Sequence, residues 1–144
     1  YPEGDYLDIC DKYNTGELDH EDEFQLQRDY GEVFFLKSFP FYTSPFFNMK
    51  ADFTTQIANK IDVILSGQET IGSAERSCDK EEMRHMFHTI SEGEYKNTLY
   101  REFSKERVDK ELDEFLSHDF FPRFGAGIGV TRMIRAMDNN KLLE

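Results

Sequence analysis

The chain has 144 residues, of which 38% are hydrophobic, so it is long and apolar enough to bury the core of a single domain over residues 1–144. Its formal net charge of −12 predicts a surface that mostly repels nucleic acid. Two cysteines, Cys10 and Cys78, exclude a disulfide-rich scaffold, and no apolar run reaches the length of a membrane span. We expect a cytoplasmic protein with no membrane partner.

The chain is expected to begin with two helices. Residues 4–14 predict a short helix that ends at Asn14, and Asp19 is a suitable N-cap for a second helix that ends at Gly31. The pattern then becomes rich in β-branched and aromatic residues. We expect strands at residues 32–39 and 46–50, followed by an exposed connection over residues 51–58.

A tight antiparallel hairpin is predicted next. Residues 60–65 and 69–71 are its strands, and Ser66-Gly67 is its two-residue turn. In this register the side chains of Asp62 and Glu69 lie on the same face of adjacent strands. Two carboxylates therefore converge diagonally across the hairpin.

The position of Arg76 relative to this pair depends on a bulge. Seven residues separate Arg76 from Glu69, so strict alternation places the two side chains on opposite faces. A bulge at Gly72-Ser73 would return Arg76 to the face of the carboxylates, and a glycine inside a strand often marks a bulge.

The second half of the chain is mainly helical. Asp79 caps a helix whose apolar stripe consists of Met83, Met86, Phe87 and Ile90. A weaker helix is expected over residues 93–103. Ser104 begins another helix, whose core-facing residues are Val108, Leu112, Phe115 and Leu116.

The last unit is expected to be a strand or loop over residues 120–129, followed by a helix. The apolar residues expected to be buried on this helix are Val130, Met133, Ile134 and Met137. Antiparallel hairpins between helical layers predict an α+β fold, with an antiparallel sheet flanked by helices, rather than a doubly wound parallel sheet.

Two segments of the chain predict a binding site, and the first is residues 62–76. Asp62 and Glu69 could hold Mg²⁺, which favours oxygen ligands and bridges phosphates, although an acidic pair on a solvated sheet face is an alternative interpretation. Arg76 could bind an anionic substrate, although an exposed Glu75-Arg76 pair is the simpler interpretation of that doublet.

A glycine-rich strand near the C-terminus is the second feature. Gly125, Gly127 and Gly129 precede a helix but lack the parallel βαβ context of a dinucleotide-binding turn. They would instead leave one strand face smooth enough for a flat base, which Arg132 could cover. A structural glycine strand packed against a helix is the alternative.

Taken together, these residues resemble a known family. The motifs are Asp62, Gly67-Gln-Glu69, Gly72-Ser-Ala-Glu-Arg76 and Gly125-Ala-Gly-Ile-Gly-Val-Thr-Arg132. In this order they resemble the C-terminal half of a class II aminoacyl-tRNA synthetase catalytic domain. The most similar subgroup is the aspartyl/asparaginyl enzymes, including the related ammonia-dependent asparagine synthetases.

The resemblance implies an ATP-dependent reaction through an aminoacyl-adenylate. The α-carboxylate of aspartate or asparagine would attack the α-phosphorus of ATP, pyrophosphate would leave, and the amino acid would then pass to tRNA. The implied partners are ATP, Mg²⁺ and one of these amino acids. Binding of tRNA would use regions outside this chain, and the parent protein would be a homodimer.

The resemblance also implies roles for individual residues. Asp62 and Glu69 would hold Mg²⁺, and Arg76, with Gly72 and Ser73, would bind the amino acid. The residues implied for ATP binding are Glu69, Gly125, Gly127, Gly129 and Arg132, of which Glu69 and Arg132 would be catalytic.

Some residues depart from the family pattern. No segment matches the family's Phe-Arg-x-Glu stretch, so the chain alone is expected to be inactive and to be part of a longer catalytic domain. Thr131 stands where the tRNA synthetases usually have an acidic residue, and Arg123-Phe124 stands where aspartyl enzymes tend to have His-Ala. The alternatives are therefore a free-standing paralogue, such as an ammonia-dependent asparagine synthetase, or a degenerate regulatory domain.

Overall fold

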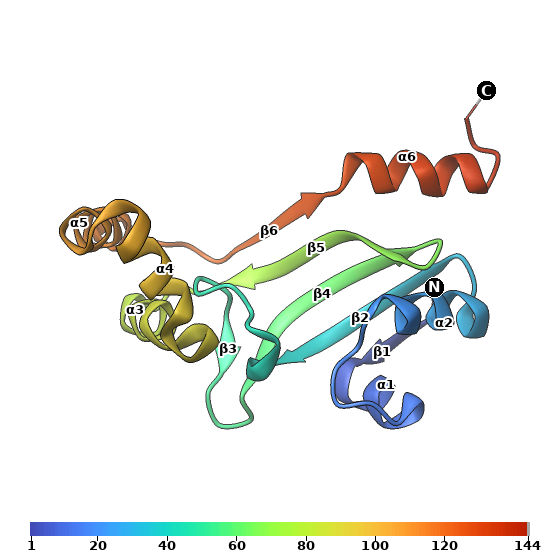
Figure 1. Cartoon of the computed structure of the whole chain (residues 1–144), viewed down its shortest axis with the longest axis horizontal. Coiled ribbons are helices and arrows are strands. Elements are labelled where there is room, and N and C mark those ends of the chain that lie inside the picture. Colours follow the sequence, from blue (N-terminus) through green and yellow to red (C-terminus); the bar gives the residue numbers. More distant parts are fainter. Residues whose placement is uncertain (144) are drawn as a thin grey trace.

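The computed structural model describes residues 1–143 and contains a central sheet with helices around it (Figure 1). In the first half of the chain the elements are β1 (Glu3–Asp5), α1 (Tyr6–Tyr13), α2 (His20–Tyr30), β2 (Val33–Pro40), a 3-10 turn (Phe41–Thr43), β3 (Ala51–Asp52), β4 (Ile57–Leu65) and β5 (Gln68–Arg76). In the second half they are α3 (Lys80–Thr89), a 3-10 turn (Ile90–Gly93), α4 (Glu94–Phe103), α5 (Lys105–Ser117), β6 (Arg123–Ile128) and α6 (Val130–Asn139).

The sheet is six-stranded, with the order β1-β2-β4-β5-β6 and with β3 paired to one end of β4. Strand β1 runs parallel to β2, and the other pairings are antiparallel. The α+β fold predicted from the sequence is therefore confirmed. No helix within residues 1–143 is long and apolar enough to cross a membrane.

Two hydrophobic clusters hold the elements together. The first lies where α1 and α2 pack on β2 and β4, and its buried members are Tyr6, Ile9, Cys10, Leu26, Phe34, Leu36, Phe39 and Ile64. The second joins α3 to α5 and contains Met83, Phe87, Val108, Leu112 and Leu116. In Figure 1, α3, α4 and α5 form a group beyond one end of the sheet, and β6 runs from this group towards α6.

Helix ends lie close to where capping residues predict them. The Asp19 side chain accepts hydrogen bonds from the backbone of α2, which ends at Gly31 as expected. Asn14 ends α1 in the left-handed conformation, with φ of 54°. Asp79 caps α3 through the backbone N–H groups of Glu81 and Glu82. These predictions are confirmed because capping is decided within a few residues.

Three predicted boundaries are wrong. Residues 46–50 do not form a strand, because Phe47 turns onto α3 and α5 and only Met49 makes a β-bridge, to Arg76. The expected exposed connection over residues 51–58 contains β3 and the buried start of β4. Residues 4 and 5, where the first helix was expected to begin, belong to β1 and pair with β2 instead.

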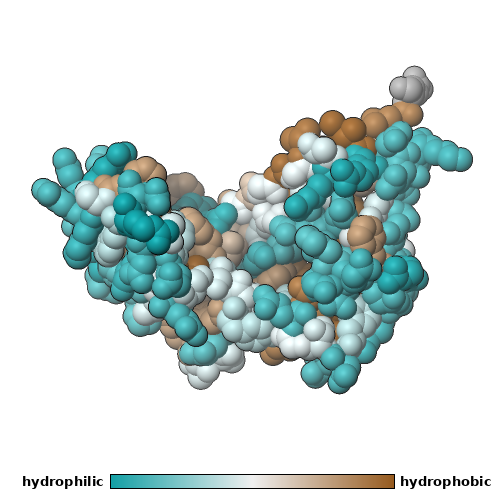
Figure 2. All heavy atoms as spheres, viewed as in Figure 1, coloured by the Kyte–Doolittle hydropathy of each residue, from teal (hydrophilic) through white to brown (hydrophobic). Residues whose placement is uncertain are grey.

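Helix α6 differs most from the expectation. Val130 and Ile134, predicted to be buried, are 64% and 51% exposed, Met133 and Met137 are half-buried, and Ala136 is the buried residue of the helix. The reason is that α6 contacts β4 and β5 with the side that carries Met133, Ala136 and Met137, which leaves Val130 and Ile134 uncovered. Figure 2 shows the resulting band of apolar residues over α6.

Candidate functional site

The β4–β5 hairpin positions the acidic pair. Glu69 lies opposite Ile64 and Gly72 lies opposite Asp62, so one residue between them on β5, Thr70, has no partner on β4. The bulge is therefore at Thr70, and the predicted position at Gly72-Ser73 is wrong. The bulge changes the alternation of β5 and places Glu69 and Arg76 on the same face as Asp62.

Contacts with α6 account for this location. The Thr70 carbonyl accepts a hydrogen bond of 2.8 Å from the backbone N–H of Gly129, immediately before α6. The Thr70 hydroxyl donates to the carbonyl of Gln68, and the residue is buried. The backbone carbonyl of the bulged residue, Thr70, thus has its hydrogen-bond donor in Gly129, which is far away in the sequence.

Asp62 and Glu69 point towards the same spot above Gly72. A Cβ added to Gly72 would lie 2.9 Å from Oε1 of Glu69 and 3.5 Å from Oδ1 of Asp62. Among the described residues, Oδ1 of Asp62 is a buried side-chain oxygen without a hydrogen-bond partner. Hard carboxylate oxygens, one of them unpartnered, fit a magnesium ion.

The number of carboxylates also fits magnesium. No group of three or more His, Cys, Asp or Glu side chains suited to a metal occurs within residues 1–143. Mg²⁺ is commonly held by one or two carboxylates together with water and substrate phosphates, rather than by a cage of protein ligands. The pair is therefore suited to a metal that arrives with a phosphate-bearing substrate.

Burial shifts the pKa of Asp62. Asp62 is 4% exposed. The pKa of its carboxyl is raised from 3.8 to about 6, mainly because of burial and to a smaller extent because of the neighbouring carboxylates of Glu69 and Glu23. The ammonium group of Lys60 opposes this shift; its Nζ is 2.5 Å from Oδ2 of Asp62. A divalent cation would stabilise the ionised pair in the same way.

Glu23 on α2 is a part of the site that the sequence analysis did not assign. Its Oε2 accepts a hydrogen bond of 2.8 Å from the backbone N–H of Glu69. Burial raises the pKa of the Glu23 carboxyl. The contact joins residues 46 positions apart, so no local pattern could have predicted it.

Arg76 lies across β6. A Cβ on Gly125 would lie 2.6 Å from Nε and 2.8 Å from Nη2 of Arg76, so the guanidinium group rests directly on the glycine backbone. Its Nη1 donates a hydrogen bond of 3.0 Å to Oδ1 of Asn48, another residue that the sequence analysis missed. Burial and the nearby Arg123 lower the pKa of Arg76. A bound anion would oppose both causes, because it would stabilise the charged form of the guanidinium group.

The remaining glycines and Arg132 continue the same surface. Gly127 has open space where a Cβ would lie, and Arg132 lies against Gly129. Nη1 of Arg132 donates a hydrogen bond of 2.7 Å to the carbonyl of Glu69. Arg132 is therefore tied to the acidic pair through the backbone, although 63 residues separate it from Glu69.

Ser73 lies away from this cluster. It pairs with Ile61 and Ala126, which alternate with Asp62 and Gly125, so its side chain lies on the other face of the sheet. Its hydroxyl donates a hydrogen bond of 2.8 Å to the carbonyl of Ile61. We therefore leave Ser73 out of the site.

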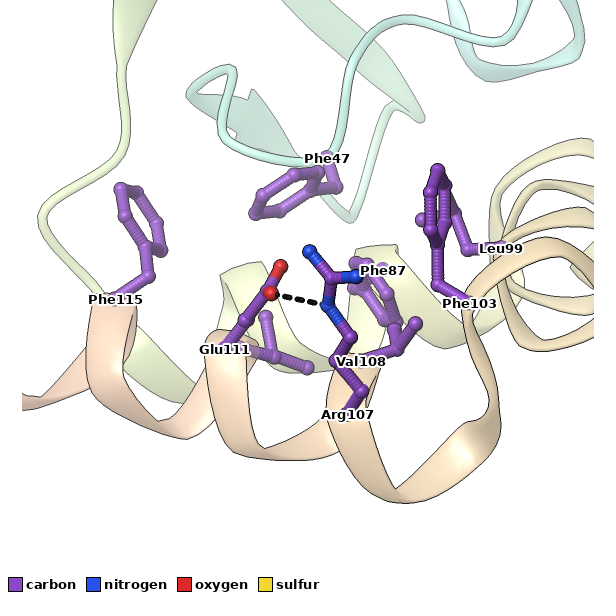
Figure 3. A pocket seen from close by; sticks show the side chains of 9 residues that line it. Phe47, Phe87, Leu99, Phe103, Arg107, Val108, Glu111 and Phe115 are labelled. Atoms are coloured by element: carbon purple, nitrogen blue, oxygen red, sulfur yellow. Dashed lines mark hydrogen bonds and ion pairs between the residues drawn. The ribbon is translucent and has the colours of Figure 1, made fainter.

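A separate apolar pocket lies among the helices. Figure 3 shows Phe47, from the loop before β3, facing α5 and the exposed ion pair of Arg107 and Glu111. Nε of Arg107 is 2.8 Å from Oε1 of Glu111. None of the predicted site residues lines this pocket. The residues that line it are Phe47, Phe87, Leu99, Phe103, Arg107, Val108, Glu111, Leu112 and Phe115.

Known structures share the fold. The aspartyl-tRNA synthetase of Entamoeba histolytica matches with a TM-score of 0.67 and 19% identity, over 95% of this chain and 28% of that protein. The asparaginyl-tRNA synthetase of Pyrococcus horikoshii, solved with asparaginyl-adenylate, matches with a TM-score of 0.68 and 19% identity, over 93% of this chain and 30% of that protein. The chain thus spans less than a third of the length of these two enzymes.

Sequence comparison gives the family. A comparison of the sequence with curated proteins found no match. The family profile of class II tRNA synthetases (D, K and N) matches residues 3–143, which is nearly the whole chain. The chain belongs to the class II tRNA synthetases of the D, K and N group.

Proposed function

We propose that the protein containing this chain activates aspartate or asparagine with ATP and then transfers the amino acid to tRNA. The observation that carries the proposal is the arrangement on one sheet face. Asp62, Glu69 and Arg76 lie on this face together with Gly72 and Gly125, whose missing side chains leave the room that the polar groups occupy.

Each group has a role that follows from its surroundings. Asp62 and Glu69 would hold Mg²⁺, which would neutralise charge on the phosphates of ATP. Arg76 would bind the side chain of the amino acid, because its guanidinium group is half-buried and lacks a carboxylate partner within 4 Å among the described residues. Arg132 would bind the nucleotide next to the carboxylates.

The positions of the two arginines support separate binding places for the two substrates. Arg76 is beside Gly125 at one end of the β5–β6 pair, and Arg132 is beside Gly129 at the other. The amino acid and the nucleotide would therefore approach from opposite ends, with the acidic pair on the same face. Positioning of this kind lowers the barrier by holding the attacking carboxylate in line with the phosphorus.

The test is amino-acid-dependent exchange of labelled pyrophosphate into ATP by the intact polypeptide, with a panel that includes aspartate and asparagine. Exchange with one amino acid would support adenylate formation and identify the substrate. Arg76→Ala is expected to lower exchange by about 100-fold while ATP binding is retained. Arg84→Ala is the matched control, because Arg84 is also half-buried but pairs with Asp113 in the helical group, away from the site. Equal loss of ATP binding in Arg76→Ala would contradict the assigned role.

One residue favours a second candidate for the acceptor. Thr131, in the first turn of α6 and next to Arg132, is similar to the small hydroxyl residue of the ammonia-dependent asparagine synthetases. In that case the adenylate would react with ammonia and release asparagine. Incubation with ATP, aspartate and ¹⁵N-ammonia would produce labelled asparagine, whereas transfer to tRNA alone would exclude this acceptor. ATP binding without exchange for any amino acid would favour a regulatory domain.

A further inference from the structure

A lysine of the chain itself occupies one side of the acidic pair. Lys60 is two residues before Asp62 on β4, and its Nζ is 2.5 Å from Oδ2 of Asp62. The same Nζ lies 3.7 Å from the centroid of the Phe39 ring. The Lys60 side chain is 20% exposed, so the ammonium group is held between a carboxylate and an aromatic face rather than extended into solvent.

The two oxygens of Asp62 consequently have different surroundings. Oδ2 is engaged by Lys60, whereas Oδ1 is buried and has no hydrogen-bond partner in the described part of the chain. Oδ1 lies on the side of Gly72, where Oε1 of Glu69 is also found. Lys60 thus leaves one oxygen of the carboxylate available on the side that faces Glu69.

We propose that Lys60 is a resident counter-ion of the magnesium site, which stabilises the acidic pair when no metal is bound and weakens metal binding. This inference rests on the proposed function, because it takes Asp62 and Glu69 as the magnesium ligands. A buried carboxylate without a cation is costly, so the metal-free site needs Lys60. The same positive charge repels a divalent cation bound to the other oxygen of the carboxylate.

The consequence is a site that depends on its phosphate-bearing substrate. Lys60 reduces the net negative charge of Asp62, Glu69 and the neighbouring Glu23 by one, which weakens Mg²⁺ binding to the carboxylates alone. Phosphate oxygens would supply the missing charge. Lys60 would therefore limit metal binding in the absence of nucleotide and couple the metal to ATP.

The test is binding of Mn²⁺, used as the probe in place of Mg²⁺, to the intact polypeptide without nucleotide, measured by calorimetry and by electron paramagnetic resonance. Lys60→Met keeps most of the side-chain length and its contact with Phe39 but removes the charge. We expect the Kd for Mn²⁺ to fall on the order of tenfold. Lys60→Arg retains the charge and is expected to keep the wild-type Kd.

A matched control and a second readout separate this role from a merely structural one. Lys50→Met removes a lysine that pairs with Glu75 at 2.7 Å and is 56% exposed, and it should leave the Kd for Mn²⁺ unchanged. In Lys60→Met the Tm without metal should fall by about 2–4 °C, and added Mn²⁺ should restore it. Lys60→Gln offers the same neutral test if Lys60→Met does not fold.

The outcomes distinguish the two proposals. A Kd for Mn²⁺ in Lys60→Met that equals or exceeds the wild-type value would overturn the role of Lys60. Asp62→Asn tests the metal site itself and should weaken Mn²⁺ binding. If Asp62→Asn binds Mn²⁺ as tightly as the wild type, the magnesium assignment in the proposed function fails as well.

Discussion

Gly125→Ala tests whether the position of Arg76, rather than its mere presence, is needed for amino-acid binding. The added Cβ would lie 2.6, 2.8 and 3.1 Å from three atoms of the Arg76 guanidinium group. Non-bonded carbon contacts are favourable at about 3.5–4.0 Å, so the group must move by about 1 Å. The obstructing atoms belong to the free end of a long side chain, and the backbone can therefore stay in place.

The expected effect is large for binding and small for stability. A displacement of about 1 Å in a positioning group can cost about 100-fold, and a lost hydrogen bond to a charged group costs about 1.5–3 kcal/mol. We expect the KM for the amino acid to rise about 10- to 100-fold. The Tm should stay constant or rise slightly, because alanine restricts the unfolded chain more than glycine does.

The assay is pyrophosphate exchange at varied amino-acid concentration, together with thermal unfolding of the same samples. Gly16→Ala is the comparison, because a Cβ there meets no atom within 4 Å and Gly16 lies outside the site. It should leave the KM for the amino acid at the wild-type value. An unchanged KM in Gly125→Ala, with exchange lowered in Arg76→Ala, would refute the inference that Arg76 acts from its place against Gly125 of β6.

Three further predictions concern stability. The pKa of Asp62 is raised from 3.8 to about 6, so its carboxyl contributes about 3 kcal/mol to the stability of the metal-free protein below about pH 4, and this contribution is lost as the pH rises through 6. Asp62→Asn should remove this pH dependence of the free energy of unfolding in urea. An unchanged pH profile would refute the prediction. Leu26→Ala, at a position with 0% exposure, should lower the free energy of unfolding by about 2–5 kcal/mol in urea titrations; a loss below about 1 kcal/mol would refute the packing of α2. Asp79→Ala removes the cap of α3 and should cost about 1 kcal/mol by the same measurement, which an unchanged midpoint would contradict.

Features decided within a few residues could be predicted from the sequence. The caps at Asp19 and Asp79 and the hairpin turn at Ser66-Gly67 are local, and the structure has them where the sequence places them. The apolar stripes of α3 and α5 were also predictable, because both helices pack on one another and bury the expected side.

Features that depend on a distant partner could not be predicted in this way. Val130 and Ile134 have the spacing of a buried helix face, yet periodicity shows only that a face is apolar and not what covers it. Phe46 and Phe47 have strand propensity, but their rings contact Tyr95 of the helical group. In each case tertiary contacts outweigh the local preference.

The candidate site combines both kinds of feature. Asp62 and Glu69 belong to one hairpin, so their convergence followed from its turn, but the bulge that brings Arg76 to the same face is held at Thr70 by the segment before α6. Glu23 likewise reaches Glu69 from α2. The acidic pair is thus held in place by Glu23 of α2 and by the segment between β6 and α6. A change at either contact should therefore alter ligand binding without removing any group that would touch a ligand.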